Sequence, residues 1–220
     1  MGITVHGAAL SPFVRKIRAA LAEKGLDYQH VHIDPVKKTP EFLAISPLGR
    51  IPVLTDGDFT CADSSVIATY LDARYPRQAL RPQEPEALAR TLWLEKFADY
   101  ELAPLTTFTV FRQRVLSGIR GLAVDESAVS QAMETGLPPL FDYLETQLAG
   151  REFAAGDRLS IADLALAVQF INLSYGGEAP DAGRWPAITA WLAGITSRAS
   201  LAPLVSAERP VVEKLRSIKA

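Results

Sequence analysis

The chain has 220 residues, of which 48% are apolar, and its 23 Lys and Arg against 25 Asp and Glu give a formal net charge of −2. This composition is enough for one large or two small cores, and the balanced charge excludes the broad basic surface that nucleic-acid phosphates require. No apolar run approaches the roughly 20 residues that span a bilayer, and the chain starts without the features of a secretory signal, so we expect a soluble, cytoplasmic protein. The single Cys61 excludes an internal disulfide and a cysteine cluster for zinc.

Strand-like and helical runs alternate over residues 1–76. In chain order they are ITVH, a helix over about 12–24, DYQHVHI, TPEFLAI, IPVLT, FTCA and a helix over about 64–74. Alternating hydrophobicity marks the strands, and apolar residues at helical spacing mark the helices. The order β-α-β-α-β-β-α predicts a small α/β domain.

The stretch "PRQALRPQEP" marks a change in the pattern, because strand-like alternation nearly disappears after it. We therefore predict an N-terminal domain over 1–76, a linker over 77–87 and an all-helical domain over 88–220. The helical runs are ALARTLWLEKFADYELAPL, ESAVSQAMETGLPPLFDYLETQLAG, SIADLALAVQFINLSY, WPAITAWLAGITSR and PVVEKLRSI. Pro104 and Pro138-Pro139 should bend or break two of them, because proline removes a helix hydrogen bond.

Ser11 and Pro12 stand at the start of the first helix, where serine is a favoured cap and proline a favoured first residue. This alone explains the serine. However, Arg15, Lys16 and Arg18 fill the first two turns, where the helix dipole is already positive and carboxylates are expected. Such an arrangement would concentrate positive potential beside the hydroxyl and favour an anion such as a thiolate or a phosphate. Helix cap and anion site both remain open.

Pro52 follows Ile51 at the beginning of a strand, in "SPLGRIPVLT". A proline there indicates either an edge strand or a cis bond in a tight turn. If the bond is cis, the backbone N–H and C=O of Ile51 are free to pair with an extended peptide.

Asp63 and Ser64 precede the apolar residues of the third helix, and capping explains one of them. A carboxylate next to a hydroxyl and free N–H groups is also suited to the zwitterionic end of an amino acid. Asp63 would bind the ammonium group, and Ser64 with nearby amides would bind the carboxylate.

Ser160 and Asp163 have the spacing of a capping box, and Leu159 with Leu164 that of a hydrophobic staple. The helix that follows is apolar on nearly all sides, which predicts that it forms the buried centre of the second domain. We therefore interpret Asp163 as a residue that supports folding, with a catalytic role as the remote alternative.

The histidines and the cysteine are weaker candidates. His30 and His32 share one strand face and would supply half of a metal site, but the only other histidine is His6, and zinc sites need three or four ligands. Cys61 lies in a predicted strand and is interpreted as a small core residue.

Taken together, the segments "SPFVRKIRAALAEKGL", "SPLGRIPVL", "ADSSVIATYLDARYP" and "FAAGDRLSIADLALA" resemble the cytosolic glutathione transferases in order and spacing. The resemblance, which covers nearly the whole chain, implies a thioredoxin-like α/β N-terminal domain, an all-α C-terminal domain and a homodimer. It implies no permanently bound cofactor and no metal, with glutathione as co-substrate. The second substrate would be a small hydrophobic electrophile bound between the domains, in an enzyme of detoxification.

The resemblance also assigns residues around the glutathione cysteine. Ser11 matches the hydroxyl that hydrogen-bonds the glutathione sulfur in the serine-type classes, and Phe13 flanks it. Ile51 would pair through its backbone with the cysteinyl part of glutathione, with Pro52 holding the turn. Serine, where related classes carry cysteine, favours transfer or addition over disulfide reduction.

The two ends of glutathione are assigned in the same way. Asp63 and Ser64 match the acidic-serine pair that holds the γ-glutamyl end, with Asp in place of the commoner Glu. Arg50, in place of the commoner Lys, would face the glycine carboxylate, assisted by Lys37 or Lys38.

Three functions remain open on the sequence alone: a glutathione transferase, a glutathione-dependent isomerase or peroxidase, and a non-catalytic binding module of the same fold. Aromatic residues are the candidates for the wall of the second-substrate cleft, although aromatics at helical spacing are more often core. These candidates are Phe13, Tyr100, Phe108, Phe111 and Tyr175.

Overall fold

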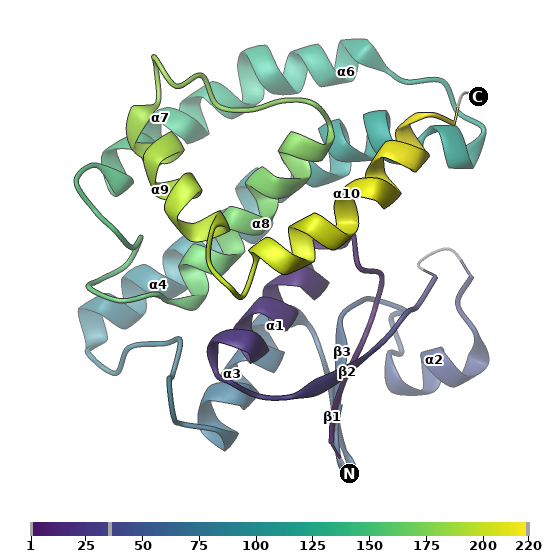
Figure 1. Ribbon diagram of the computed structural model, residues 1–220, viewed down its shortest axis with the longest axis vertical. Coiled ribbons are helices and arrows are strands. Elements are labelled where there is room, and N and C mark those ends of the chain that lie inside the picture. The colour runs from purple at the N-terminus through teal and green to yellow at the C-terminus, as the bar shows by residue number, and fades with distance from the viewer. Residues whose placement is uncertain (1, 35–36, 219–220) are drawn as a thin grey trace.

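The computed structural model describes residues 2–34 and 37–218 (Figure 1). Its N-terminal part contains the predicted strands and helices in the predicted order. They are β1 (Ile3–His6), α1 (Pro12–Glu23), β2 (Tyr28–Val31), α2 (Pro40–Ile45), β3 (Val53–Asp56), β4 (Phe59–Ala62) and α3 (Ser64–Arg74).

The four strands form one mixed sheet in the order β2-β1-β3-β4. β1 pairs in parallel with β2 and antiparallel with β3, and β3 pairs antiparallel with β4. Figure 1 shows α1 and α3 on one face of this sheet and α2 on the other. This is the thioredoxin-like arrangement that the sequence predicts.

Helix α1 is held in place by a row of buried apolar residues, and residues that favour a helix start and a helix end lie at its two ends. Val14, Ile17 and Leu21 are fully buried against the sheet and the helical part of the chain. The helix ends at Glu23, and Gly25 follows with φ of 65°, a conformation that glycine adopts without strain.

The rest of the described chain is helical. Its elements are α4 (Pro85–Phe97), η1 (Ala98–Leu102), α5 (Ala103–Leu105), η2 (Thr106–Leu116), η3 (Gly118–Arg120), α6 (Glu126–Gln131), η4 (Ala132–Gly136), α7 (Leu137–Leu148), α8 (Ile161–Tyr175), α9 (Pro186–Thr196) and α10 (Ala202–Arg216). Helix α8 is buried on nearly every side and packs against α1, as predicted for the centre of this domain. None of the helices in the described ranges is long and apolar enough to cross a membrane.

The prolines inside two helical runs do not break them. The run from Pro85 to Leu116 stays helical through Pro104, and the run from Glu126 to Leu148 stays helical through Pro138-Pro139. π-helical turns lie on both sides of Pro104 and just before α7. Because a π turn bonds residues five apart, the carbonyl that a proline ring would meet in an α-helix is displaced.

Two helical segments were missed by the sequence analysis. Residues 106–116 form η2, although "TTFTVF" favours a strand by its β-branched and aromatic content, and α10 begins at Ala202, eight residues before the predicted start at Pro210. Packing of η2 against α8 overrides the local preference.

The predicted linker is fixed at several points. Asp72 in α3 accepts hydrogen bonds from the amides of Leu80 and Arg81 and pairs with Lys24 at 2.8 Å. Leu80 is only 5% exposed. Helix α3 ends at Arg74 and α4 begins at Pro85, but the boundaries 1–76, 77–87 and 88–220 stay a prediction.

Candidate functional site

Three of the predicted segments meet at one end of the sheet. In the strand register His6 lies opposite Val53, and Val53 lies opposite Ala62. The next residues beyond these pairs are Gly7, Pro52 and Asp63. The loop before α1, the turn before β3 and the start of α3 are therefore neighbours.

Gly7 allows a close approach between these segments. A Cβ atom built on Gly7 would overlap the side chain of Val14 in α1 and lie 3.4 Å from Cβ of Ile51. The absence of a side chain at Gly7 thus lets the first turn of α1 reach the residue before Pro52.

Ser11 is the N-cap of α1, as predicted. It has extended backbone angles, and its Oγ accepts a hydrogen bond from Val14 N at 3.4 Å. The hydroxyl proton has no acceptor among the described residues, and the side chain is half-buried. Ser11 can therefore cap the helix through a lone pair and still donate a hydrogen bond to a ligand.

The bond between Ile51 and Pro52 is cis, which is one of the two interpretations that the sequence left open. The other, an edge strand, is wrong, because β3 lies between β1 and β4. Neither backbone polar group of Ile51 has a hydrogen-bond partner within the described chain. Both are available to an extended ligand.

Asp63 caps α3, and its backbone has φ of 76°. Its Oδ1 accepts from the amides of Ser65 at 2.8 Å and Val66 at 3.2 Å. Its Oδ2 has no hydrogen-bond donor in the described chain, and neither do the amide and hydroxyl of the buried Ser64 have partners there. Capping therefore occupies Oδ1 of Asp63 and leaves Oδ2 available to a ligand.

Arg50 lies in a turn that Ser46 closes. The hydroxyl of Ser46 donates to Arg50 O at 2.8 Å and accepts from Arg50 N at 3.0 Å. The side chain of Lys38 lies against Gly49, so closely that a Cβ there would overlap it. Two cationic residues, Arg50 and Lys38, thus flank the same turn beside Ile51. All three candidates are exposed, and the amide of Lys37 donates to Asp34.

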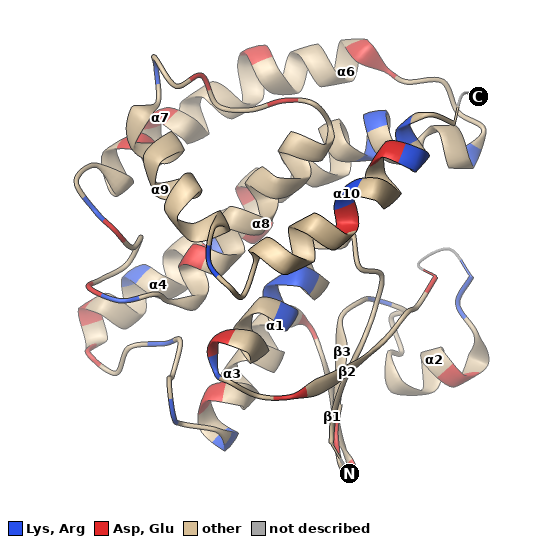
Figure 2. Cartoon of the chain, viewed as in Figure 1, with Lys and Arg blue, Asp and Glu red and all other residues tan. Residues whose placement is uncertain are grey.

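Of the three basic residues expected to concentrate positive charge beside Ser11, Arg15 and Lys16 bind acidic residues of the helical domain, and Arg18 Nε donates to the hydroxyl of Tyr28 at 3.1 Å. Arg15 and Lys16 are fully buried. Figure 2 shows basic residues, in blue, on the part of α1 that lies next to α10. Arg15 binds Glu208 of α10, and Lys16 binds Glu95 of α4 and Asp99 of η1. These ion pairs neutralise the charges of Arg15 and Lys16, so the helix N-terminus itself is a positive feature beside Ser11.

The aromatic candidates for a cleft divide into two groups. Phe13 of α1 stacks on Phe108 of η2 with ring centroids 6.2 Å apart, and Phe108 is 52% exposed. Tyr100 is also exposed. Phe111 and Tyr175 are buried and belong to the core, which is the alternative that the sequence left open for aromatics at helical spacing.

The histidines have structural partners. His30 hydrogen-bonds to Gly7 O at 2.9 Å, and His6 to Thr55 Oγ1 at 3.3 Å. Burial lowers the pKa of both imidazoles. Over residues 2–34 and 37–218 there is no group of three or more residues suited to hold a metal ion.

Cys61 is partly buried in β4 and packs against the core, and burial raises the pKa of its thiol to about 11. Because the thiolate is the reactive form, this thiol is inert at neutral pH.

Asp163 joins the start of α8 to its surroundings. Its two oxygens accept from Ala154 N, Ser160 N, Ser160 Oγ and Trp191 Nε1, over 2.7 to 3.1 Å. Burial raises the pKa of this carboxyl although the four donors act in the opposite direction. The capping box is therefore present, and Asp163 serves folding.

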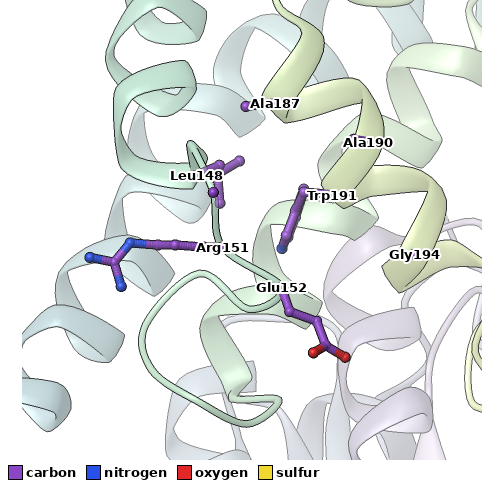
Figure 3. Close-up of a pocket in the computed structure, with 8 residues that line it drawn as sticks. Leu148, Arg151, Glu152, Ala187, Ala190, Trp191 and Gly194 are labelled. Atoms are coloured by element: carbon purple, nitrogen blue, oxygen red, sulfur yellow. The ribbon is translucent and has the colours of Figure 1, made fainter.

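A hollow of about 260 Å³ lies near Asp163, between the end of α7, the following loop and α9 (Figure 3). Leu148, Arg151 and Trp191 are among its lining residues, and none of the predicted site residues is. The indole nitrogen of Trp191 is already bound to Asp163. This hollow has no part in the candidate site.

Sequence reasoning missed Asn172 and Glu208, which are buried and bind α1 from the helical domain. Asn172 gave a signal, because it is one of the few polar residues in a largely apolar helix. Glu208 gave none, because its helix was predicted to begin after it.

A thioredoxin-like domain carries free backbone groups before a cis-proline and a hydroxyl at the start of α1, and a helical domain packs behind it. Free N–H and C=O groups of this kind can pair with an extended peptide. Residues 5–84 match the family model described as the glutathione S-transferase N-terminal domain, and residues 127–194 match the C-terminal domain of the same family. The chain belongs to the glutathione S-transferase family.

Individual relatives agree with this assignment. The chain is 32% identical to glutathione S-transferase F10 of Arabidopsis thaliana over 213 residues, which cover 91% of this chain and 94% of the relative. A crystal structure of a glutathione S-transferase from Rhodospirillum rubrum is similar with a TM-score of 0.85 and 30% identity, over 92% of this chain and 91% of that one. Glutathione S-transferase-I bound with lactoylglutathione is similar with a TM-score of 0.82 and 25% identity, over 94% and 99%.

Proposed function

We propose that this chain is a glutathione transferase in which Ser11 activates the glutathione thiol for attack on a hydrophobic electrophile. The observation that carries the proposal is the free hydroxyl proton of Ser11 at the N-terminus of α1. Ser11 would donate it to the sulfur and stabilise the thiolate, acting as an electrostatic group and not as a nucleophile.

The expected interaction free energies are large enough to lower the pKa of the glutathione thiol by about two units. A free thiol has a pKa of about 8.5, and lowering it by two units requires about 2.7 kcal/mol of preferential stabilisation of the thiolate. A hydrogen bond to a charged group contributes about 1.5–3 kcal/mol. The helix N-terminus adds about 0.3–1 kcal/mol.

The rest of glutathione fits the groups around Ser11. The free N–H and C=O of Ile51 would pair with the cysteinyl backbone, with Pro52 fixing the turn and Phe13 alongside. At one end, Asp63 and Ser64 would bind the ammonium and carboxylate of the γ-glutamyl group. At the other end, the glycine carboxylate would meet Arg50, assisted by Lys38.

The electrophile would lie beside the Phe13–Phe108 stack, where α1 meets η2 and Phe108 presents an exposed aromatic face. The thiolate would form a carbon–sulfur bond, and a leaving group would depart with its electron pair, or a proton from solvent would complete an addition. Measuring glutathione conjugation to a generic aromatic electrophile tests this function, and a purified protein with no such activity would contradict it.

The Asp63→Asn variant separates the two roles that we assign to Asp63. Asparagine caps helices as well as aspartate and tolerates a positive φ, so the free energy of unfolding should stay within about 0.5 kcal/mol of the parent value. The charge that attracts the glutathione ammonium is lost, so KM for glutathione should rise about tenfold. Steady-state kinetics and urea unfolding measure the two effects.

The Asp63→Ala variant is the matched comparison, because it removes both the cap and the charge. It should raise KM similarly and also lower the free energy of unfolding by about 1 kcal/mol. An unchanged KM in the Asp63→Asn variant would show that the carboxylate is a cap alone.

We also propose that the protein is a cytoplasmic homodimer, formed through apolar residues exposed on α3 and α4. Val66 of α3 is 52% exposed, and Trp93 of α4 is 55% exposed. Lys96 of α4 hydrogen-bonds to Ser65, which brings the two helices together. Exposed apolar residues on adjoining helices are typical of a protein interface.

The Val66→Asp variant should therefore sediment as a monomer under conditions in which the parent protein sediments as a dimer. Val211→Asp, on α10, is the control, because Val211 is 48% exposed and lies outside this surface. A parent protein that sediments as a monomer, or a dimeric Val66→Asp variant, would contradict the proposed interface.

A further inference from the structure

We propose that Asn172, together with Arg15 and Glu208, forms a clamp by which the helical domain sets the position of the Ser11 hydroxyl. In this role the three are positioning residues, because none of them is placed at the glutathione sulfur. The inference rests on the proposed function of Ser11.

The segment between β1 and α1, residues 7–11, has no regular structure and is held by backbone hydrogen bonds and by side chains from elsewhere. His30 binds Gly7 O at 2.9 Å, and Ser11 N donates to Ala8 O at 3.0 Å. The carbonyl of Leu10, directly before Ser11, accepts from Nδ2 of Asn172 at 3.4 Å. This last contact crosses from α8 of the helical domain.

Asn172 is fully buried, and its amide holds both sides of Ser11. Its Oδ1 accepts from Arg15 Nη1 at 2.9 Å, and its Nδ2 also donates to Thr107 Oγ1 at 3.2 Å. The amide of Arg15 in turn donates to Ser11 O at 2.9 Å. One side chain therefore ties the residue before the cap to the first turn after it.

Glu208 fixes the other side of the Arg15 guanidinium. Its Oε2 accepts from Arg15 Nε at 2.8 Å and Nη2 at 2.5 Å, and from the hydroxyl of Tyr175 at 2.9 Å. Its Oε1 is buried with no hydrogen-bond partner in the described chain. A buried ion pair with an unpartnered oxygen is a poor source of stability, since apolar residues of similar volume often replace such pairs without loss. It does fix the direction of Arg15, and hence of Asn172.

The arrangement makes activation of the thiol by Ser11 sensitive to Asn172, which lies far from Ser11 in the sequence. A hydrogen bond weakens steeply when its donor is displaced or turned. If the clamp is removed, Leu10 and Ser11 can shift, and the hydroxyl then points less accurately at the sulfur. Glutathione should still bind, because the groups for its two ends, at Asp63 and Arg50, do not belong to the clamp.

The test compares Asn172→Leu with Gln169→Met, a matched control. Gln169 is also a fully buried amide of α8, and its Oε1 accepts from Thr106 and Thr107. Unlike Asn172, it has no hydrogen bond to residues 7–15 in the described part of the chain. Three quantities are measured on the folded protein: the apparent pKa of the bound glutathione thiol from thiolate absorbance, the Kd for glutathione from calorimetry, and kcat for conjugation.

In the Asn172→Leu variant, the pKa of the bound thiol should rise by about one unit. With a parent pKa about two units below 8.5, this rise lowers the thiolate fraction at pH 7 about threefold, and kcat at that pH should fall by a similar factor. The Kd for glutathione should change less than about threefold. Gln169→Met should leave the thiol pKa at the parent value. A merely structural contact would lower stability in both variants and leave the thiol pKa alone.

Glu208→Gln is a second variant, which keeps an acceptor for Arg15 without the charge, and it serves if Asn172→Leu does not fold. It should raise the thiol pKa by a smaller amount. Parent-like thiol pKa and kcat in the folded variants would overturn the clamp and leave the role of Ser11 intact. A parent protein that binds no glutathione, or does not lower its thiol pKa, would overturn the proposed function and the clamp with it.

Discussion

Replacing Ser11 with alanine should lower kcat/KM for glutathione conjugation at neutral pH by about 10- to 100-fold. This range corresponds to the loss of one hydrogen bond to a charged sulfur, about 1.5–3 kcal/mol. The deficit should shrink as the pH rises above about 8.5, because the thiol then ionises without assistance. A pH profile of both proteins with a generic aromatic electrophile measures the effect.

Thr39→Ala is the matched control for the lost helix cap. Thr39 is followed by Pro40 and accepts from Phe42 N at 3.3 Å, as Ser11 is followed by Pro12 and accepts from Val14 N. Both substitutions remove a hydroxyl cap. Equal losses of activity in the two variants would show that capping, and not donation to sulfur, explains the serine.

Replacing Asp163 with alanine should lower the free energy of unfolding by about 3–5 kcal/mol. The change leaves the donors at Ala154, Ser160 and Trp191 buried without an acceptor, and each unmet buried group costs about 1–3 kcal/mol. Water can bind some of these donors, so the total loss of stability should stay below the sum of the separate costs. Urea unfolding measures the loss.

The exposed Asp157 lies in the loop before α8, and Asp157→Ala should change the free energy of unfolding by less than about 0.5 kcal/mol. Below its unfolding temperature the Asp163→Ala variant should retain near-parental kcat, since Asp163 lies outside the candidate site. Normal stability with lost activity would instead give Asp163 a catalytic role.

Local signals in the sequence predicted most of the fold. The Ser11 cap, the Gly25 end of α1 and the capping box at Asp163 each depend on a few neighbouring residues, and all are present. The helical conformation of residues 106–116 depends on packing against α8, which no local pattern encodes.

The candidate site also combines features that local sequence predicts with features that depend on the fold. Cap positions follow from short motifs, whereas the motif around Pro52 left a cis bond and an edge strand as alternatives. The direction in which Arg15 points follows from no short motif, because its partner Glu208 lies 193 residues away in the chain. A charge that is read as part of an anion site can therefore be neutralised by a residue brought close only by the fold.

The most direct test of the account is a crystal structure of the protein with glutathione bound. We expect the sulfur within about 3.5 Å of Ser11 Oγ, the cysteinyl backbone paired with Ile51 and the γ-glutamyl end at Asp63 and Ser64. A sulfur directed away from Ser11, with the tripeptide otherwise in place, would contradict the claim that this hydroxyl activates the thiol.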